Sequence, residues 1–150
     1  MLERLLPQPA DNTYRGHWLA LWLFGALLIM KIGMSLGCIF NGYTTAVSAD
    51  GIPLDTFPSA AAQTVLYLFA SWGLAHLVIA ILGALVLVRY RSLVPLMLLL
   101  LLLELLARKL ARQFLPVVTT GTPPSGLINM VLISAMAAGL VLSLRKWGQS

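Results

Sequence analysis

Residues 93–114 read LVPLMLLLLLLELLARKLARQF, a leucine-rich run that also carries four charged side chains. When a helix inserts into a membrane, a glutamate near its middle costs about 3 kcal/mol, whereas each leucine contributes about 0.5 kcal/mol. The ten leucines from Leu93 to Leu106 therefore roughly offset Glu104. We expect this segment to enter a membrane, with Glu104 facing protein rather than lipid.

The composition of the whole chain is that of an integral membrane protein. Of its 150 residues, 59% are hydrophobic and 10% are charged, against about 25% charged in soluble domains. The formal net charge is +5, but the basic residues flank or interrupt apolar runs, so a nucleic-acid partner is not expected. With Cys38 as the single cysteine, the chain forms no intramolecular disulfide and no cysteine-based metal set.

Four apolar runs are long enough to cross a bilayer, which takes about 20 helical residues. The first exceeds the apolar core of a secretory signal and contains Lys31, so we expect it to be retained as a helix. Residues 1–17 predict a short tail with at most an interfacial turn. The prediction is one all-α membrane domain, an antiparallel bundle of four transmembrane helices, with spans at about 18–40, 64–88, 93–114 and 127–144 and outer loops at 41–62 and 115–126.

The distribution of arginine and lysine predicts the orientation of this bundle. Basic residues are enriched in cytoplasmic loops, and both predicted outer loops lack them. Both termini should therefore be cytoplasmic. The basic residues on that side are Arg4, Arg15, Arg89, Arg91, Arg145 and Lys146.

Small residues at intervals of four indicate two helix faces that allow close packing. Gly33 and Gly37 flank Ser35 in the first span, and Ala135, Gly139 and Ser143 repeat along the fourth. Such faces are common where membrane helices touch one another.

Polar residues of all four spans fall at similar depths. At a rise of 1.5 Å per residue from the cytoplasmic ends, Lys31 lies about 20 Å deep, His76 about 18 Å, Glu104 about 16 Å and Ser134 about 15 Å. Arg108 and Asn129 form a second layer at about 22 Å by the same count. A buried carboxylate requires a partner, and Lys31 and Arg108 are the available ones.

Three interpretations of this predicted buried polar cluster are open. In the first, it fixes the register of the helices, while Lys109 and Arg112 at the outer rim extend to the interface or pair with Asp50 and Asp55. In the second, the excess of positive charge forms an outward-facing pocket for an anionic head group or a small anion. In the third, His76 and Glu104 belong to a proton pathway.

Motifs of catalysis and metal binding are missing from the sequence. It has no His-x-x-x-His or Glu-x-x-His pair, no Gly-x-Ser-x-Gly and no Gly-rich phosphate loop. We therefore predict no catalytic residues, no metal and no cofactor, although a bound lipid is compatible with the basic pocket.

Several features resemble those of small four-helix proteins of bacterial inner membranes, distantly like the DoxX group. They are Lys31, Asn41-Gly42, Asp50-Gly51-Ile52-Pro53, Arg89-Tyr90-Arg91 and Glu104-x-x-x-Arg108-Lys109. The resemblance implies a multi-pass protein of the bacterial inner membrane with four helices and cytoplasmic termini. It also implies an association with membrane redox or quinone-linked systems.

Three hypotheses for function follow from the sequence. The first is a non-enzymatic accessory subunit or homo-oligomer that packs against other membrane helices through its small-residue faces. The second is a binder or transporter of an anionic lipid head group or small anion, using Lys31, Arg108, Arg112 and Asn129. The third is a quinone-linked redox accessory protein with His76 and Trp72 near the ring.

Overall fold

The structure, a computed structural model, describes residues 5–145. The secondary structure of this part is helical and contains no strand, which confirms the prediction of an all-α fold. The long helices are α2 (Trp18–Phe40), α4 (Ser59–Arg89), α5 (Val94–Phe114) and α6 (Ser125–Leu144). The short helical turns are α3 (Gly42–Thr44), η1 (Thr45–Ala49), η2 (Leu54–Thr56) and η3 (Arg91–Leu93). Arg4 and Lys146, expected at the cytoplasmic side, lie outside the described residues.

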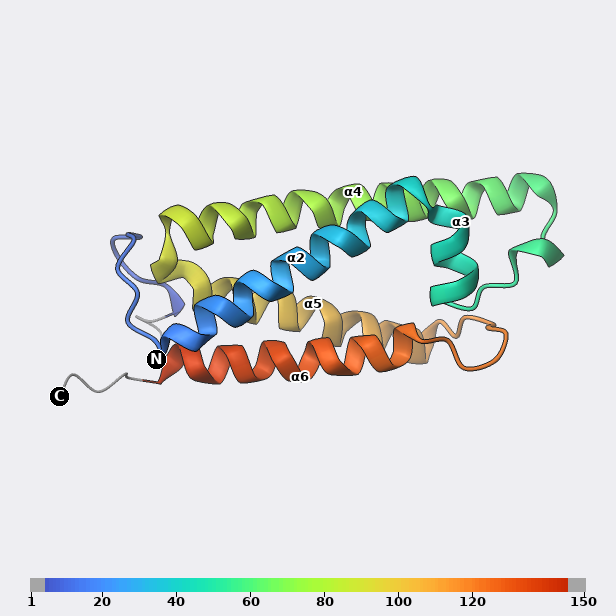
Figure 1. Ribbon diagram of the computed structural model, residues 1–150. Coiled ribbons are helices and arrows are strands. Elements are labelled where there is room, and N and C mark those ends of the chain that lie inside the picture. The colour runs from blue at the N-terminus through green and yellow to red at the C-terminus, as the bar shows by residue number, and fades with distance from the viewer. Residues whose placement is uncertain (1–4, 146–150) are drawn as a thin grey trace.

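The long helices lie side by side, and the direction of the chain alternates from each to the next (Figure 1). The main packing partners are α2 with α4, α5 with α6, and α2 with α6. At one end of the molecule, His17 N donates to Leu142 O at 3.1 Å. At the opposite end, Thr120 N donates to Gly51 O at 2.8 Å, which joins the two loops there. Hydrogen bonds thus tie the chain together at both ends.

Two segments expected to be irregular are helical. The second long helix begins at Ser59 rather than near Thr64, because Pro58 precedes it and residues 60–62 are alanines, the strongest helix formers. Directly after α2, residues 42–49 continue as α3 and η1 instead of a loop. The loop between the first two long helices is accordingly shorter than predicted.

The segment before α2 is also tied to the body of the protein. Ser92 Oγ donates to Asp11 O at 2.8 Å, and Asp11 N donates back to Ser92 Oγ at 3.0 Å. The backbone of Gly16 lies so close to the carbonyl of Ser143 that a side chain there would clash. Residues 11–17 therefore cover the end of the helices at which α5 begins.

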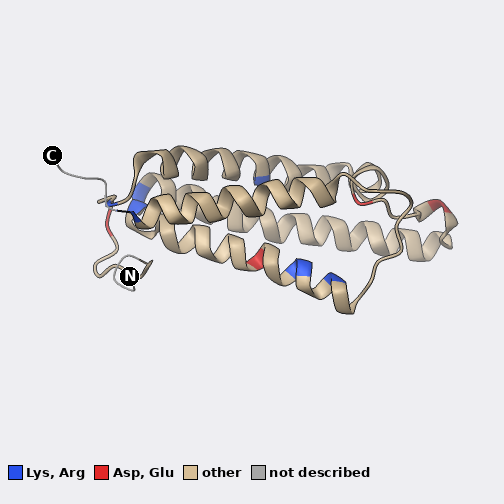
Figure 2. Cartoon of the chain, turned by 90° about the horizontal axis from the view of Figure 1, so that it is seen from below, with Lys and Arg blue, Asp and Glu red and all other residues tan. Residues whose placement is uncertain are grey.

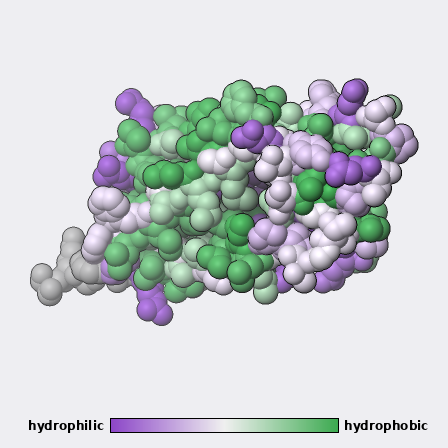
Figure 3. Space-filling model, turned by 45° about the vertical axis from the view of Figure 1, so that its right-hand side comes forward, coloured by the Kyte–Doolittle hydropathy of each residue, from purple (hydrophilic) through white to green (hydrophobic). Residues whose placement is uncertain are grey.

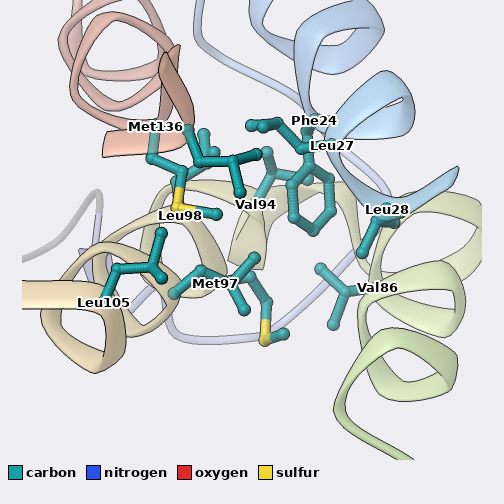
Figure 4. Packing of buried hydrophobic residues seen from close by; sticks show 11 residues of the cluster. Phe24, Leu27, Leu28, Val86, Val94, Met97, Leu98, Leu105 and Met136 are labelled. Atoms are coloured by element: carbon teal, nitrogen blue, oxygen red, sulfur yellow. The ribbon is translucent and has the colours of Figure 1, made fainter. Parts of the chain in front are cut away.

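The core is apolar and lies toward that same end. Phe24, Leu98 and Met136 are fully buried, and they come from α2, α5 and α6 (Figure 4). Leu132 of α6 is fully buried as well. Close approach of α2 and α4 depends on Gly73, whose added Cβ would lie 2.8 Å from the Ser35 carbonyl oxygen and from Cys38 Cβ. The helices are thus in direct backbone contact just outside the core.

Three helices are long and apolar enough to cross a membrane: α2, α4 and α6. Helix α5 is not one of them, because it carries four charged residues: Glu104, Arg108, Lys109 and Arg112. Large apolar side chains are exposed along the outside, as at Ile29 (74%) and Leu127 (73%). Hydrophobic residues cover much of the face in Figure 3, and hydrophilic ones gather mostly toward its ends. Such a surface exceeds the apolar patches of soluble proteins and supports a membrane protein.

Candidate functional site

The carboxylate of Glu104, near the middle of α5, contacts three basic side chains. Lys31 Nζ, from α2, donates to Oε2 at 2.8 Å. On the other carboxylate oxygen, Oε1, His76 Nε2 of α4 lies at 3.2 Å and Arg108 Nη1 of α5 at 3.3 Å. Among residues 5–145 these are the only ion pairs. Three long helices therefore meet at one acid.

Lys31 is the most buried member of this group, with 5% of its surface exposed. It lies on the face of α2 that packs against the other helices, and Ser35 Oγ donates to its backbone carbonyl at 2.8 Å. Without Glu104, this ammonium would be an unpaired charge in the interior. The Lys31–Glu104 contact thus joins α2 to α5 at a defined height.

His76 is held by two acceptors on opposite sides of its ring. Nδ1 lies 3.0 Å from the Trp72 carbonyl oxygen one turn earlier in α4, and Nε2 faces Glu104. A carbonyl oxygen and a carboxylate both accept hydrogen bonds, so a proton on each ring nitrogen satisfies both contacts. The ring of His76 thus bridges the Trp72 carbonyl oxygen and the Glu104 carboxylate.

Arg108 is fixed by an aromatic ring as well as by Glu104. Its guanidinium carbon lies 4.2 Å from the centroid of the Trp72 ring, a cation–π geometry. Trp72 in turn meets the His76 ring edge-on, with centroids 4.7 Å apart. The sequence placed Trp72 beside His76, but its stacking on Arg108 was missed. The i, i+4 spacing of Trp72 and His76 indicates only that these two rings are neighbours on α4.

From α6 the site receives Asn129 and not Ser134. Asn129 lines a cavity of about 30 Å³ together with Lys31, His76 and Arg108, room for roughly one or two water molecules. Ser134 is exposed, and its hydroxyl donates to Met130 O at 3.0 Å. The buried face of α6 runs through Leu132 and Met136, and Ser134 points away from it.

The outer basic rim has no acidic partner within the described part of the chain. Arg112 is exposed, and Lys109 Nζ lies 3.2 Å from Met130 Sδ. The expected pairing with Asp55 is not seen, since Asp55 accepts a hydrogen bond from the Tyr43 hydroxyl at 2.6 Å, which raises the pKa of Tyr43. Asp50 forms no ion pair with any residue of 5–145 either, although it lines the same cavities as Arg112. Beyond Glu104, α5 therefore carries uncompensated positive charge (Figure 2).

Two larger cavities lie on either side of this basic part of α5. One, of about 360 Å³, lies toward α4 and is lined by Phe69 and Trp72. The other, of about 370 Å³, lies toward α6 and is lined by Lys109, Asn129 and Met130. Both are lined by Asp50, Arg108 and Arg112. Guanidinium groups present several N–H donors in a plane, which suits the oxygens of phosphate and carboxylate groups.

Comparison of the chain with protein-family models, with curated proteins and with solved structures gives no match. Among the residues that the structure describes, no group of three or more His, Cys, Asp or Glu side chains is arranged to hold a metal ion.

Proposed function

We propose that this chain is a four-span integral membrane protein of a bacterial inner membrane with both termini in the cytoplasm. Supporting this topology, α2, α4 and α6 have the length and apolarity of membrane spans, and α6 ends near the start of α2. The chain must then cross once more between the end of α4 and the start of α6. Only α5 lies in that interval.

The charges support both the crossing of α5 and its orientation. Its ten leucines offset the insertion of Glu104, and Lys31 and Arg108 neutralise the carboxylate, which also contacts the His76 ring. Arg89 and Arg91 lie at the end where α4 passes to α5, and Arg15 and Arg145 lie at that same end. Such a concentration of arginine favours the cytoplasmic side.

Within this topology, the protein binds an anionic group, either a lipid head group or a small anion. The observation that carries this proposal is the charge balance of α5: Glu104 is already shared by three basic groups, while Arg112 and Lys109 have no carboxylate partner among residues 5–145. Cavities of 360 to 370 Å³ adjoin these side chains, a volume in the range of ligand sites, about 300–1,000 Å³. An anion there would pair with Arg112, which lines both cavities, and in the cavity toward α6 also with Lys109.

Native mass spectrometry of the purified protein in detergent tests this function. We expect it to retain phosphatidylglycerol and to retain little uncharged diacylglycerol. Arg112→Gln should lower the retention of phosphatidylglycerol at least about fivefold, because a hydrogen bond to a charged group is lost. Inorganic phosphate, as a competitor, distinguishes a small-anion site from a head-group site.

Arg89→Gln is the matched control, because Arg89 is an exposed arginine at the opposite end of the molecule. Its retention of lipid should equal that of the unmodified protein. Equal retention by Arg112→Gln, or failure of the unmodified protein to retain phosphatidylglycerol and bind phosphate, would contradict the proposal.

A second candidate function is that of an accessory or homo-oligomeric subunit. A specific observation favours it: a side chain added at Gly33 would meet no atom within 4 Å, so this small-residue face of α2 is open to another helix. By contrast, Gly139 already packs against Leu23 and Leu98 of the same chain. Gly33→Leu should dissociate such a complex in size-exclusion chromatography, whereas an unchanged elution volume would count against it.

A further inference from the structure

The cavity between α4 and α5 lies at the level of lipid head groups. Counted from Val94, the start of α5, at 1.5 Å per residue, Arg112 is about 27 Å from the cytoplasmic end, whereas the hydrocarbon core is about 30 Å thick. Asp50 belongs to the loop beyond the end of α2 and lines the same cavity. The charged part of the cavity thus lies at the membrane–water interface on the side away from the cytoplasm.

The walls of this cavity suit an amphiphile better than a small hydrophilic anion. Its charged groups are Asp50, Arg108 and Arg112. The remaining wall is mainly apolar, with Phe69, Leu115 and Val117 among its members. A lipid with its head group at the charged residues would therefore have its acyl chains against apolar side chains and the surrounding lipid.

The charges of this cavity come in a nearly balanced set. Arg108 already shares its charge with Glu104, so Arg112 and Asp50 remain, one of each sign. Neither forms an ion pair within the described residues. The cavity on the other side of α5 differs, because Lys109 adds a further positive charge there. A ligand between α4 and α5 thus meets both a free cation and a free anion.

The backbone holds Asp50 in place without the help of its side chain. Its N–H donates to Thr45 O at 3.1 Å. The next residue, Gly51, has φ of +70° and accepts hydrogen bonds from both Thr120 N, at 2.8 Å, and Thr120 Oγ1, at 3.1 Å. A side chain would be strained at that φ. The Asp50 carboxylate is therefore positioned at the cavity and free to accept hydrogen bonds from a ligand.

We propose that this cavity binds a phospholipid whose head group carries a primary ammonium, with its phosphate at Arg108 and Arg112 and its ammonium at Asp50. This inference rests on the anion-binding function proposed above and specifies its ligand. Phosphatidylethanolamine is the simplest lipid of that class. Phosphatidylcholine has a quaternary nitrogen that keeps its charge but cannot donate a hydrogen bond to Asp50, and phosphatidylglycerol has no cation to pair with Asp50.

Competition among these lipids, read by native mass spectrometry of the full chain, tests the proposal. From an equimolar mixture, phosphatidylethanolamine should be retained about three- to fivefold over the other two, the increment expected for one partly exposed charge pair against phosphatidylglycerol and for one hydrogen bond against phosphatidylcholine. Asp50→Asn should abolish that preference, while its backbone hydrogen bonds keep the loop in place. The matched control is Asp55→Asn, a carboxylate of the same loop that lines neither cavity, and it should keep the preference.

The outcomes separate this inference from the function on which it rests. Equal retention of the three lipids, all weakened by Arg112→Gln, overturns the ammonium site and leaves anion binding standing. The same holds if Asp50→Asn keeps the preference. Retention of none of the lipids overturns both. Water-soluble phosphoethanolamine, added as a competitor, should displace little lipid, because it lacks the acyl chains that contact the apolar wall.

Discussion

Lys31 and Glu104 form the most buried ion pair of the described chain, so each should depend on the other for its contribution to stability. Lys31→Met leaves the carboxylate with His76 and Arg108 alone. Breaking a buried pair costs about 3–5 kcal/mol, and we expect the lower end, about 3 kcal/mol, since Glu104 keeps two partners. Reversible unfolding in mixed micelles with increasing dodecyl sulfate measures this loss.

The double variant Lys31→Met with Glu104→Met separates pairing from packing. Replacing both charges by apolar groups removes the uncompensated carboxylate, so the double variant should be more stable than Lys31→Met alone. Lys109→Met is the control, because Lys109 is exposed and has no carboxylate partner among the described residues. It should change stability by less than about 0.5 kcal/mol. Stability of Lys31→Met equal to that of the unmodified protein would refute the importance of the pair.

Counting depth along each span predicted that Lys31, His76, Glu104 and Arg108 could meet, and the structure brings these four together. Depth fixes the height of a residue but not the rotation of its helix. Ser134 has the required height, yet it points outward, whereas Asn129 faces the site. The stacking of Arg108 on Trp72 also depends on rotation and side-chain rotamers, which the spacing of polar residues does not contain.

At the scale of the helices, the crossing of α2 and α4 should be sensitive to a single methyl group. Gly73→Ala would place its Cβ 2.8 Å from the Ser35 carbonyl oxygen, a backbone atom that moves only with its helix. We expect a loss of about 1–3 kcal/mol, typical of overpacking. Gly33→Ala is the control, since its added methyl meets nothing within 4 Å. Similar unfolding curves for the two variants in mixed micelles would contradict a close crossing at Gly73.

The apolar runs predict where the helices occur, but the ends of the helices depend on other local signals. Pro58 and Ala60–Ala62 extend α4 beyond the apolar run, although the same residues follow turn-forming sequence. The segment before α2 has no periodic pattern, and its order depends on contacts with Ser92 and Ser143, which are distant in the sequence. Tertiary contacts of this kind leave no signal in local composition.

At the scale of the whole molecule, the contacts at the two ends link the topology of all four long helices. Thr120 to Gly51 joins the loop after α5 to the loop after α2, and His17 to Leu142 joins the start of α2 to the end of α6. If α2, α4 and α6 cross the membrane while these contacts are kept, α5 must cross as well. A three-span arrangement would place the loops on opposite sides and break the Thr120–Gly51 hydrogen bonds.

Cysteine labelling distinguishes these arrangements. In a Cys38→Ala background, single cysteines at Asp55, Thr122 and Asn12 would be treated with a membrane-impermeant maleimide, since all three positions are exposed. With four spans, Asp55→Cys and Thr122→Cys should react in intact spheroplasts, whereas Asn12→Cys should react only after lysis. With three spans, Thr122→Cys would be protected like Asn12→Cys. The Thr120–Gly51 contact requires residues 51 and 120 to lie on one side of the membrane. Protection of Thr122→Cys while Asp55→Cys reacts would therefore exclude the packing of α5 described here.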